Sequence, residues 1–200
     1  MLPPLTIQLF GGVHLFYNDA PLPIPKSRKG LALFLYLACT QRAHTREALA
    51  DLLWDTTSIK QSLSNLRTVL SRLPAALRDL IVLTGESVAI KPGALQVDVW
   101  ALEQTVDRLA QPLSAPVAAQ ARRSLQNYRG DFLAGFQLND APRFEEWMLI
   151  ERERLRMRAL AGYQRLTDYC LETGAYREQD SRLPPNCCAW TPPMKPATAT

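Results

Sequence analysis

The sequence has 200 residues, enough for one large domain or two small ones. Its 23 lysines and arginines outnumber the 19 acids, and the formal net charge of +4 suits an anionic partner without identifying one. The first residues lack the basic segment of a signal peptide. The longest apolar run, GLALFLYLAC, is about half of the roughly 20 residues that a membrane-spanning helix needs. We therefore expect a soluble, cytoplasmic protein.

Catalytic and metal-binding patterns are missing from the sequence. The four cysteines form no Cys-x-x-Cys pair, and His14 and His44 belong to no metal-ligand pattern, so a structural role is the favoured interpretation of both histidines. The sequence also lacks the glycine-rich loop with Lys and Ser/Thr that binds ATP phosphates. We expect no enzyme activity, no cofactor and no metal.

The first β-type segments are three short runs at residues 5–10, 13–17 and 22–25, which turn residues separate. They predict a small antiparallel sheet. From residue 27 the apolar spacing becomes helical and predicts a first helix that ends near residue 39. Thr45 can cap a second helix over residues 46–54.

A third helix is predicted over residues 58–73. Ser58 and Gln61 have the spacing of a capping box, in which two side chains satisfy free amides at a helix start. One face of this helix is apolar and carries Ile59, Leu63, Leu66, Leu70 and Leu73. The opposite face carries Lys60, Ser64, Arg67 and Ser71, flanked by Gln61, Asn65, Thr68 and Arg72.

This polar face is typical of a helix that reads double-stranded DNA. No acid occurs between Asp55 and Asp79, although four basic residues do, and an acid in this stretch would repel phosphates. A helix in the major groove uses Arg and Lys for phosphates and guanine, Asn and Gln for adenine, and short hydroxyl side chains for close approach. The alternative is a solvated helix that lacks acids by chance. The candidate DNA-binding residues of the helix are Lys60, Gln61, Ser64, Asn65, Arg67, Thr68 and Arg72.

Within this set, we expect Asn65 and Arg67 to face bases, and Lys60 and Arg72 to hold phosphates. The following segment, residues 81–91, has two β-type runs around Gly85-Glu86 and predicts a hairpin with a type II′ turn. This hairpin is a candidate wing. Lys91 could reach a phosphate from it, whereas Glu86 at the tip is unsuited to the minor groove, so only backbone contacts are expected of the wing.

A second basic group, Lys26, Arg28 and Lys29, lies at the start of the first helix, where positive charge opposes the helix dipole. A solvated basic segment is the favoured interpretation, and a nearby anion is the alternative.

The second half of the sequence is helical. After a strand-like segment at residues 95–99, helical patterns cover residues 101–110, 118–128 and 144–174, the last as two helices or as one with a bend near Gly162. Glutamates and arginines alternate over residues 145–158, which indicates a charged helix surface with internal ion pairs. Helix pairs of this kind suggest a helical-repeat module.

Residues 5–177 resemble the bacterial SARP/BTAD transcriptional activators. The resemblance rests on LTIQLFGG, REALADLLW and SLSNLRTVLSRL in the first half, and on VDVWALE, YRGDFLAGF, FEEWMLIERERLR and YCLETGAY in the second. It implies an α+β winged helix-turn-helix of the OmpR type, followed by an all-α bacterial transcriptional activation domain of tetratricopeptide-like helices. It also implies promoter binding, a helical half that contacts a partner domain or RNA polymerase, and two copies bound as a homodimer on direct repeats.

The expected domains are a winged helix at residues 1–95, a truncated activation domain at 96–177 and a disordered tail at 178–200. The tail is rich in proline and has no helical periodicity where a repeat should continue. A shift of reading frame near Arg177 would explain this break, since it converts the tail into a sequence with helical periodicity. A protein-interaction module built on the truncated helical scaffold, without specific DNA binding, is the alternative function.

Overall fold

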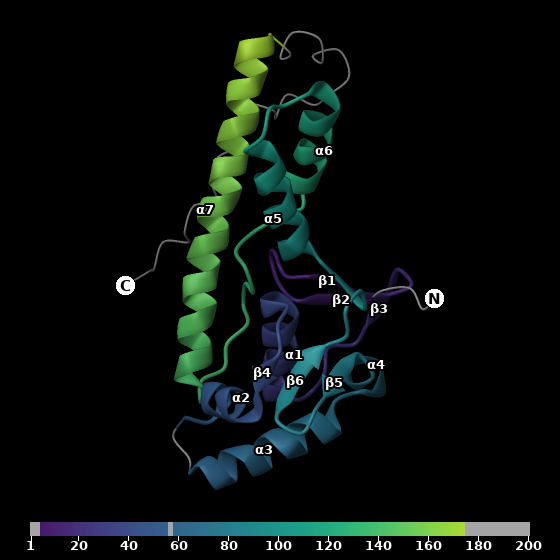
Figure 1. The fold of residues 1–200 in the computed structure, drawn as a ribbon, viewed down its shortest axis with the longest axis vertical. Coiled ribbons are helices and arrows are strands. Elements are labelled where there is room, and N and C mark those ends of the chain that lie inside the picture. The colour runs from purple at the N-terminus through teal and green to yellow at the C-terminus, as the bar shows by residue number, and fades with distance from the viewer. Residues whose placement is uncertain (1–4, 56–57, 175–200) are drawn as a thin grey trace.

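The computed structural model describes residues 5–55 and 58–174, which form a mixed α/β region followed by a helical region (Figure 1). The predicted tail at residues 178–200 lies outside the described residues. The helices are α1 (Arg28–Thr40), α2 (Arg46–Leu53), α3 (Ile59–Arg72), α4 (Ala75–Arg78), α5 (Asp98–Leu109), α6 (Ala115–Leu125) and α7 (Pro142–Thr173). The strands are β1 (Leu5–Gln8), β2 (His14–Tyr17), β3 (Ala20–Leu22), β4 (His44–Thr45), β5 (Ile81–Leu83), β6 (Ser87–Ile90) and β7 (Leu95–Val97).

The first sheet has the strand order β3-β2-β1-β7. The antiparallel pairs β1–β2 and β2–β3 confirm the predicted N-terminal sheet, whereas β7 pairs with β1 in parallel. The third strand ends at Leu22, before the expected 22–25, because Pro23 and Pro25 lack the N–H that a ladder requires. The sheet therefore joins the start of the chain to the segment directly before α5.

Three capped helices follow this sheet. Ser27, Thr45 and Ser58 each accept a hydrogen bond from the backbone N–H three residues later, at 3.1, 3.2 and 3.4 Å. The caps predicted at Thr45 and Ser58 are confirmed, and α1, α2 and α3 agree with the expected helices within one residue. The second half of the predicted capping box does not form, because the Gln61 side chain donates to Asn65 Oδ1 at 2.9 Å instead.

The predicted hairpin is present as β5 and β6, and β4 extends it to a three-stranded sheet of order β4-β6-β5. Its turn is not of type II′, since Gly85 does not adopt the positive φ that this turn requires. The Thr84 side chain replaces that geometry: its Oγ1 accepts a hydrogen bond from Ser87 N at 3.0 Å. The short helix α4, which was not predicted, connects α3 to this sheet.

The helical region packs α5, α6 and α7 together, and α7 runs as one 32-residue helix along the molecule (Figure 1). The sequence left open whether this segment forms two helices or one with a bend, and the form with two separate helices is wrong. Gly162 lies inside α7 at a close helix contact: a Cβ at this position would be 3.2 Å from side-chain atoms of Val106 and Leu125. Within residues 5–55 and 58–174, no helix is long and apolar enough to cross a membrane.

One continuous core connects the α/β region to the helical region. Trp147 of α7 packs against Tyr36 of α1, with ring centroids 4.9 Å apart, and also contacts Phe132 and Phe144. The Asp98 carboxylate, at the start of α5, accepts hydrogen bonds from Leu9 N at 2.7 Å and from Phe10 N at 3.1 Å. Polar bonds and aromatic packing thus hold the two regions in a fixed relation.

Candidate nucleic-acid interface

The inner side of α3 fixes which residues the helix presents outward. Leu66 and Leu70 are 1% and 5% exposed and belong to the core. Ser62, which the sequence analysis left out, is 3% exposed, and its hydroxyl donates to Trp54 O at 2.9 Å. Ile59 was expected on the apolar face but is 73% exposed, because the first turn of α3 extends past the core. The inward side therefore combines leucines with one hydrogen-bonded serine.

The outer side of α3 presents most of the predicted DNA-binding residues. Exposed side chains are those of Lys60, Gln61, Ser64, Arg67, Thr68 and Arg72, whereas Asn65 is half-buried. At about 100° per residue, Ser64 and Thr68 lie near the middle of this face. Asn65 and Arg67 lie at its opposite edges, roughly 160° apart around the axis. The helix thus brings the seven predicted residues to one surface, but it separates the two that were expected to read bases.

The side chains on this face bond within their own helix or stay unpaired. Thr68 Oγ1 donates to Ser64 O at 3.0 Å, and Ser71 Oγ donates to Thr68 O at 2.9 Å, which keeps both hydroxyls close to the helix. Among the described residues, none of the three cations Lys60, Arg67 and Arg72 forms an ion pair. The middle of the face therefore carries only short side chains that lie close to the helix. The cations around it are available to an anion.

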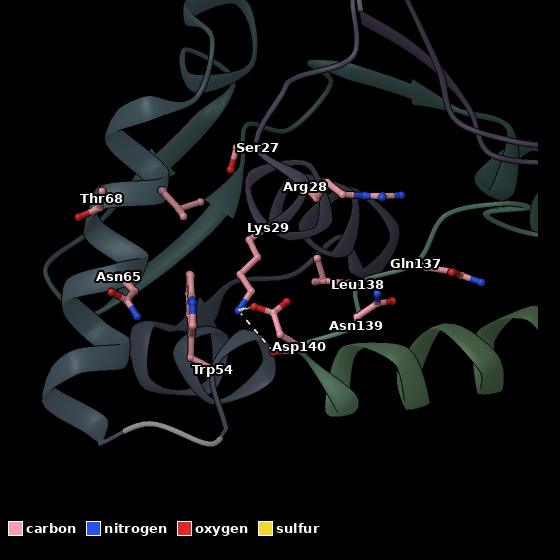
Figure 2. Close-up of a pocket in the computed structure, with 11 residues that line it drawn as sticks. Ser27, Arg28, Lys29, Trp54, Asn65, Thr68, Gln137, Leu138, Asn139 and Asp140 are labelled. Carbon is pink, nitrogen blue, oxygen red and sulfur yellow. Dashed lines mark hydrogen bonds and ion pairs between the residues drawn. The ribbon is translucent and has the colours of Figure 1, made fainter.

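A polar cleft of about 620 Å³ adjoins the Asn65 edge. Figure 2 shows Asn65 and Thr68 on one wall, and the start of α1 together with residues 137–140 on the other. Lys29 lies between them: its Nζ is 2.8 Å from Asp140 Oδ2, donates to Leu53 O at 3.0 Å and lies 5.0 Å from the Trp54 ring centroid. For Lys29 the favoured sequence interpretation, a solvated cation, is therefore wrong, and the alternative of a nearby anion holds, since the Asp140 carboxylate pairs with it and links the two regions.

A smaller groove of about 190 Å³ adjoins the Arg67 edge, between α3 and β5. Arg46 and Arg78 line it together with Arg67, over an apolar floor that includes Leu70 and Ile81. Arg46 donates from Nε to Gly85 O and from Nη2 to Thr84 O, each at 3.1 Å, so it is fixed to the turn of the hairpin. Neither Arg46 nor Arg78 was among the predicted site residues, although the acid-free stretch that singled out α3 contains Arg78.

The other two charged residues of the hairpin, Glu86 and Lys91, do not line this groove. Lys91 is exposed and follows β6, so it lies at the end of the hairpin opposite the turn. Its backbone N–H donates to Leu80 O at 2.8 Å. Lys91 lines neither cleft, and the structure does not bring it together with the α3 residues. Glu86 is exposed in the turn, as expected from the sequence.

No cluster of three or more potential metal-ligating side chains occurs within residues 5–55 and 58–174. His44 contacts Thr40 Oγ1 through Nε2 at 2.7 Å, and its ring packs on Tyr36 with centroids 4.8 Å apart. Burial lowers the pKa of this histidine, and the charge of Arg42 lowers it further. These contacts explain His44 as a packed residue of the α/β region.

An exposed cationic helix in a mixed α/β region, joined to a helical bundle, is the arrangement that the resemblance of the sequence implied. Residues 97–185 match the family model described as bacterial transcriptional activator domain. This match agrees with the resemblance to the SARP/BTAD transcriptional activators that the motifs of the second half indicated.

A solved structure, titled Mycobacterium tuberculosis EmbR in complex with low affinity phosphopeptide, has a similar fold, with a TM-score of 0.54 and 20% sequence identity. The match covers 88% of this chain and 49% of that one, so the present chain spans about half the length of the solved relative. No curated protein matches the sequence.

Proposed function

We propose that the chain is a transcriptional regulator that binds double-stranded DNA in a sequence-specific manner through α3. The observation that carries this proposal is the outer face of α3, where Lys60, Arg67 and Arg72 are exposed without an ion pair among the described residues and no acid occurs along the helix. Structural arginines and lysines at a surface are commonly balanced by nearby acids, whereas a phosphate-binding face excludes them.

In this proposal α2 and α3 form the helix-turn-helix, and the β5–β6 hairpin is the wing. Ser64 and Thr68 lie in the middle of the face, where short side chains allow the helix to approach the base edges. The bond between Gln61 and Asn65 holds both amides in a fixed orientation before DNA arrives. Lys60 and Arg72 contact phosphates on either side of the groove, and Lys91 adds a phosphate contact from the base of the wing.

The helical region serves, in this proposal, as the activation domain. The proposed domains are residues 1–95 and 96–177, the second with tetratricopeptide-like helices that contact a protein partner such as RNA polymerase. Two copies of the chain bind direct repeats in the operator. Trp147 packs against α1 and Asp98 binds the backbone directly after β1, so these contacts fix the helical region relative to the α/β region that carries α3.

A second candidate function is a protein-interaction module without specific DNA binding. It is favoured by apolar side chains on the outer side of α7: Leu149, Ile150, Met157 and Leu171 are 56%, 62%, 54% and 66% exposed. Single exposed apolar residues are common, but several along one helix are typical of a surface that another protein covers.

Selection of duplexes from a random-sequence library separates the two functions. A DNA-binding regulator enriches a defined motif at 0.1 M salt, and it then binds the selected duplex more tightly than a scrambled duplex by roughly a thousandfold or more. Electrophoretic mobility shift with scrambled competitor measures this ratio. Failure to enrich any motif would reject specific DNA binding and leave the interaction module.

A further inference from the structure

We infer that the groove between α3 and β5 is a binding site for DNA backbone phosphates, formed by Arg46, Arg67 and Arg78; this inference rests on the proposed function. It assigns Arg46 and Arg78, which were not among the predicted site residues, to the interface. It also moves Arg67 from base recognition to the backbone.

The three arginines come from three separate elements and meet in one groove without a carboxylate. Arg46 begins α2, Arg67 lies on α3, and Arg78 ends α4. No aspartate or glutamate lines the groove, and none of the three arginines forms an ion pair within the described part of the chain. An apolar floor strengthens their mutual repulsion, since it lowers the local dielectric constant. An anion in the groove removes this repulsion.

Two of the guanidinium groups are already anchored, and each retains donors for a ligand. Arg46 uses two N–H groups for the carbonyls of Thr84 and Gly85, and Arg78 uses one for Ser71 O at 3.4 Å. A guanidinium group has five N–H donors, so three remain on Arg46 and four on Arg78. Phosphate oxygens take such donors in pairs. Because two bonds hold the Arg46 side chain before binding, little of its side-chain entropy is lost on contact.

The groove lies where a DNA strand has to pass. When α3 enters the major groove and the hairpin lies over the adjacent minor groove, the sugar-phosphate backbone that separates the two grooves runs between helix and hairpin. Arg67, at the hairpin-side edge of α3, points into this path and not at the middle of the base-reading face. The acidic turn residue Glu86 is thereby explained, because the phosphate contact near the wing comes from the groove and not from the turn.

Salt-dependent binding of three single variants tests the inference. Arg46→Gln, Arg67→Gln and Arg78→Gln are each measured by fluorescence anisotropy on the duplex selected by the wild-type chain and on its scrambled version. Each variant is expected to weaken binding to both duplexes by the same factor, roughly five- to tenfold at 0.1 M salt, and to reduce the slope of log K against log salt by about 1. The motif selected by Arg67→Gln stays that of the wild type.

Two controls keep the result specific. Arg123→Gln removes one exposed cation from α6 and is expected to change neither affinity nor slope. Arg46→Lys keeps the charge but loses the paired bonds to the hairpin turn, so a role in holding the wing alone would make Arg46→Gln and Arg46→Lys weaken binding equally, both with an unchanged slope. That result would overturn the assignment of Arg46.

The remaining outcomes each decide one proposal. Normal affinity and slope for Arg46→Gln and Arg78→Gln, in a chain that does select a motif, reject the groove and leave the proposed function intact. A loss by Arg67→Gln on the selected duplex alone returns Arg67 to base recognition and removes it from the groove. A wild-type chain that binds no duplex rejects both proposals together.

Discussion

Helices α3 and α7 both carry arginines on their outer sides. Arginines of α7 form ion pairs, whereas those of α3 form none among the described residues. On α7, Arg154 contacts Glu151 within the helix and Glu103 of α5, and Arg156 pairs with Glu153. On α3, Arg67 and Arg72 have no such partner among the described residues. The sequence already shows the difference, since acids alternate with arginines in α7 and are missing from α3.

The contrast shows that net charge is a poor guide to a nucleic-acid interface. The hydrogen bonds to Glu151 and Glu103 raise the pKa of the Arg154 guanidinium. The charge of Arg154 is therefore already paired within the folded chain. Surface ion pairs of this kind contribute about 0–1 kcal/mol each. The cations of α3 form no ion pair among the described residues, so they remain available to the DNA of the proposed function. The two surfaces differ in whether their cations are already paired with acids, and not in the number of positive charges.

The largest expected effect concerns the buried sides, where the two helices should behave alike. Leu66 of α3 and Leu155 of α7 are 1% and 0% exposed. Leu66→Ala and Leu155→Ala should each lower the free energy of unfolding by ~2–5 kcal/mol, because each leaves a cavity in the core. Denaturant unfolding followed by circular dichroism measures the loss. Leu171→Ala, at a 66% exposed position, serves as control and should cost less than ~0.5 kcal/mol.

The same experiment tests whether the two regions unfold together. Because one core joins α3 to α7, both buried variants should shift a single transition. Two separate transitions in Leu66→Ala, one of them at the wild-type position, would show that the contacts of Trp147 and Asp98 do not couple the regions energetically.

A smaller effect is expected when the outer sides are compared directly. Lys60→Gln with Arg72→Gln should weaken binding to the selected duplex by roughly tenfold or more, about 1.4 kcal/mol, and leave the free energy of unfolding within ~0.5 kcal/mol of the wild type. The matched pair Arg154→Gln with Arg156→Gln should leave binding unchanged and lower stability only slightly, because exposed ion pairs contribute little to folding. Anisotropy and denaturant unfolding are measured on all four proteins. An equal loss of DNA affinity in both pairs would remove the distinction between the helices.

The local signals in the sequence predicted the helices of the α/β region well. Ser58 and Thr45 cap α3 and α2 as expected, because a cap depends only on residues within one turn. The outward set on α3 follows from the same local periodicity. By contrast, the type II′ turn at Gly85 was wrong, because the Thr84 side chain competes with the backbone for Ser87 N. A short hydroxyl side chain was enough to change the turn.

The features that a sequence pattern could not supply are the long-range ones. The parallel pair β1–β7 and the link from Lys29 to Asp140 join segments about half the chain apart. The arginine groove is of the same kind: Arg46, Arg67 and Arg78 are ordinary surface residues of three helices until the fold brings them together. Spacing along one helix predicts a face, whereas a site between helices requires their packing.

The smallest predicted effect is a pH dependence in the α/β region. The pKa of His44 is lowered by burial, so between its folded value and the ordinary 6.5 the unfolded chain binds a proton that the folded chain does not. Stability therefore falls as pH drops through 6.5 toward the folded pKa. Acidification from pH 7.5 to 5.5 should thus act on the region around α1 and β4.

Replacement of His44 isolates this contribution. His44→Gln keeps a polar side chain near Thr40 but cannot take up a proton in this range, so its stability should fall less steeply from pH 7.5 to 5.5 than that of the wild type. His14 is present in both proteins and cancels in the difference. Denaturant unfolding at several pH values measures the two slopes. Equal slopes would contradict the prediction, as would a wild-type chain that gains stability on acidification.

Amide exchange at Val88, which pairs with His44, should quicken on acidification in the wild type more than in the variant, after correction for the intrinsic effect of pH on exchange.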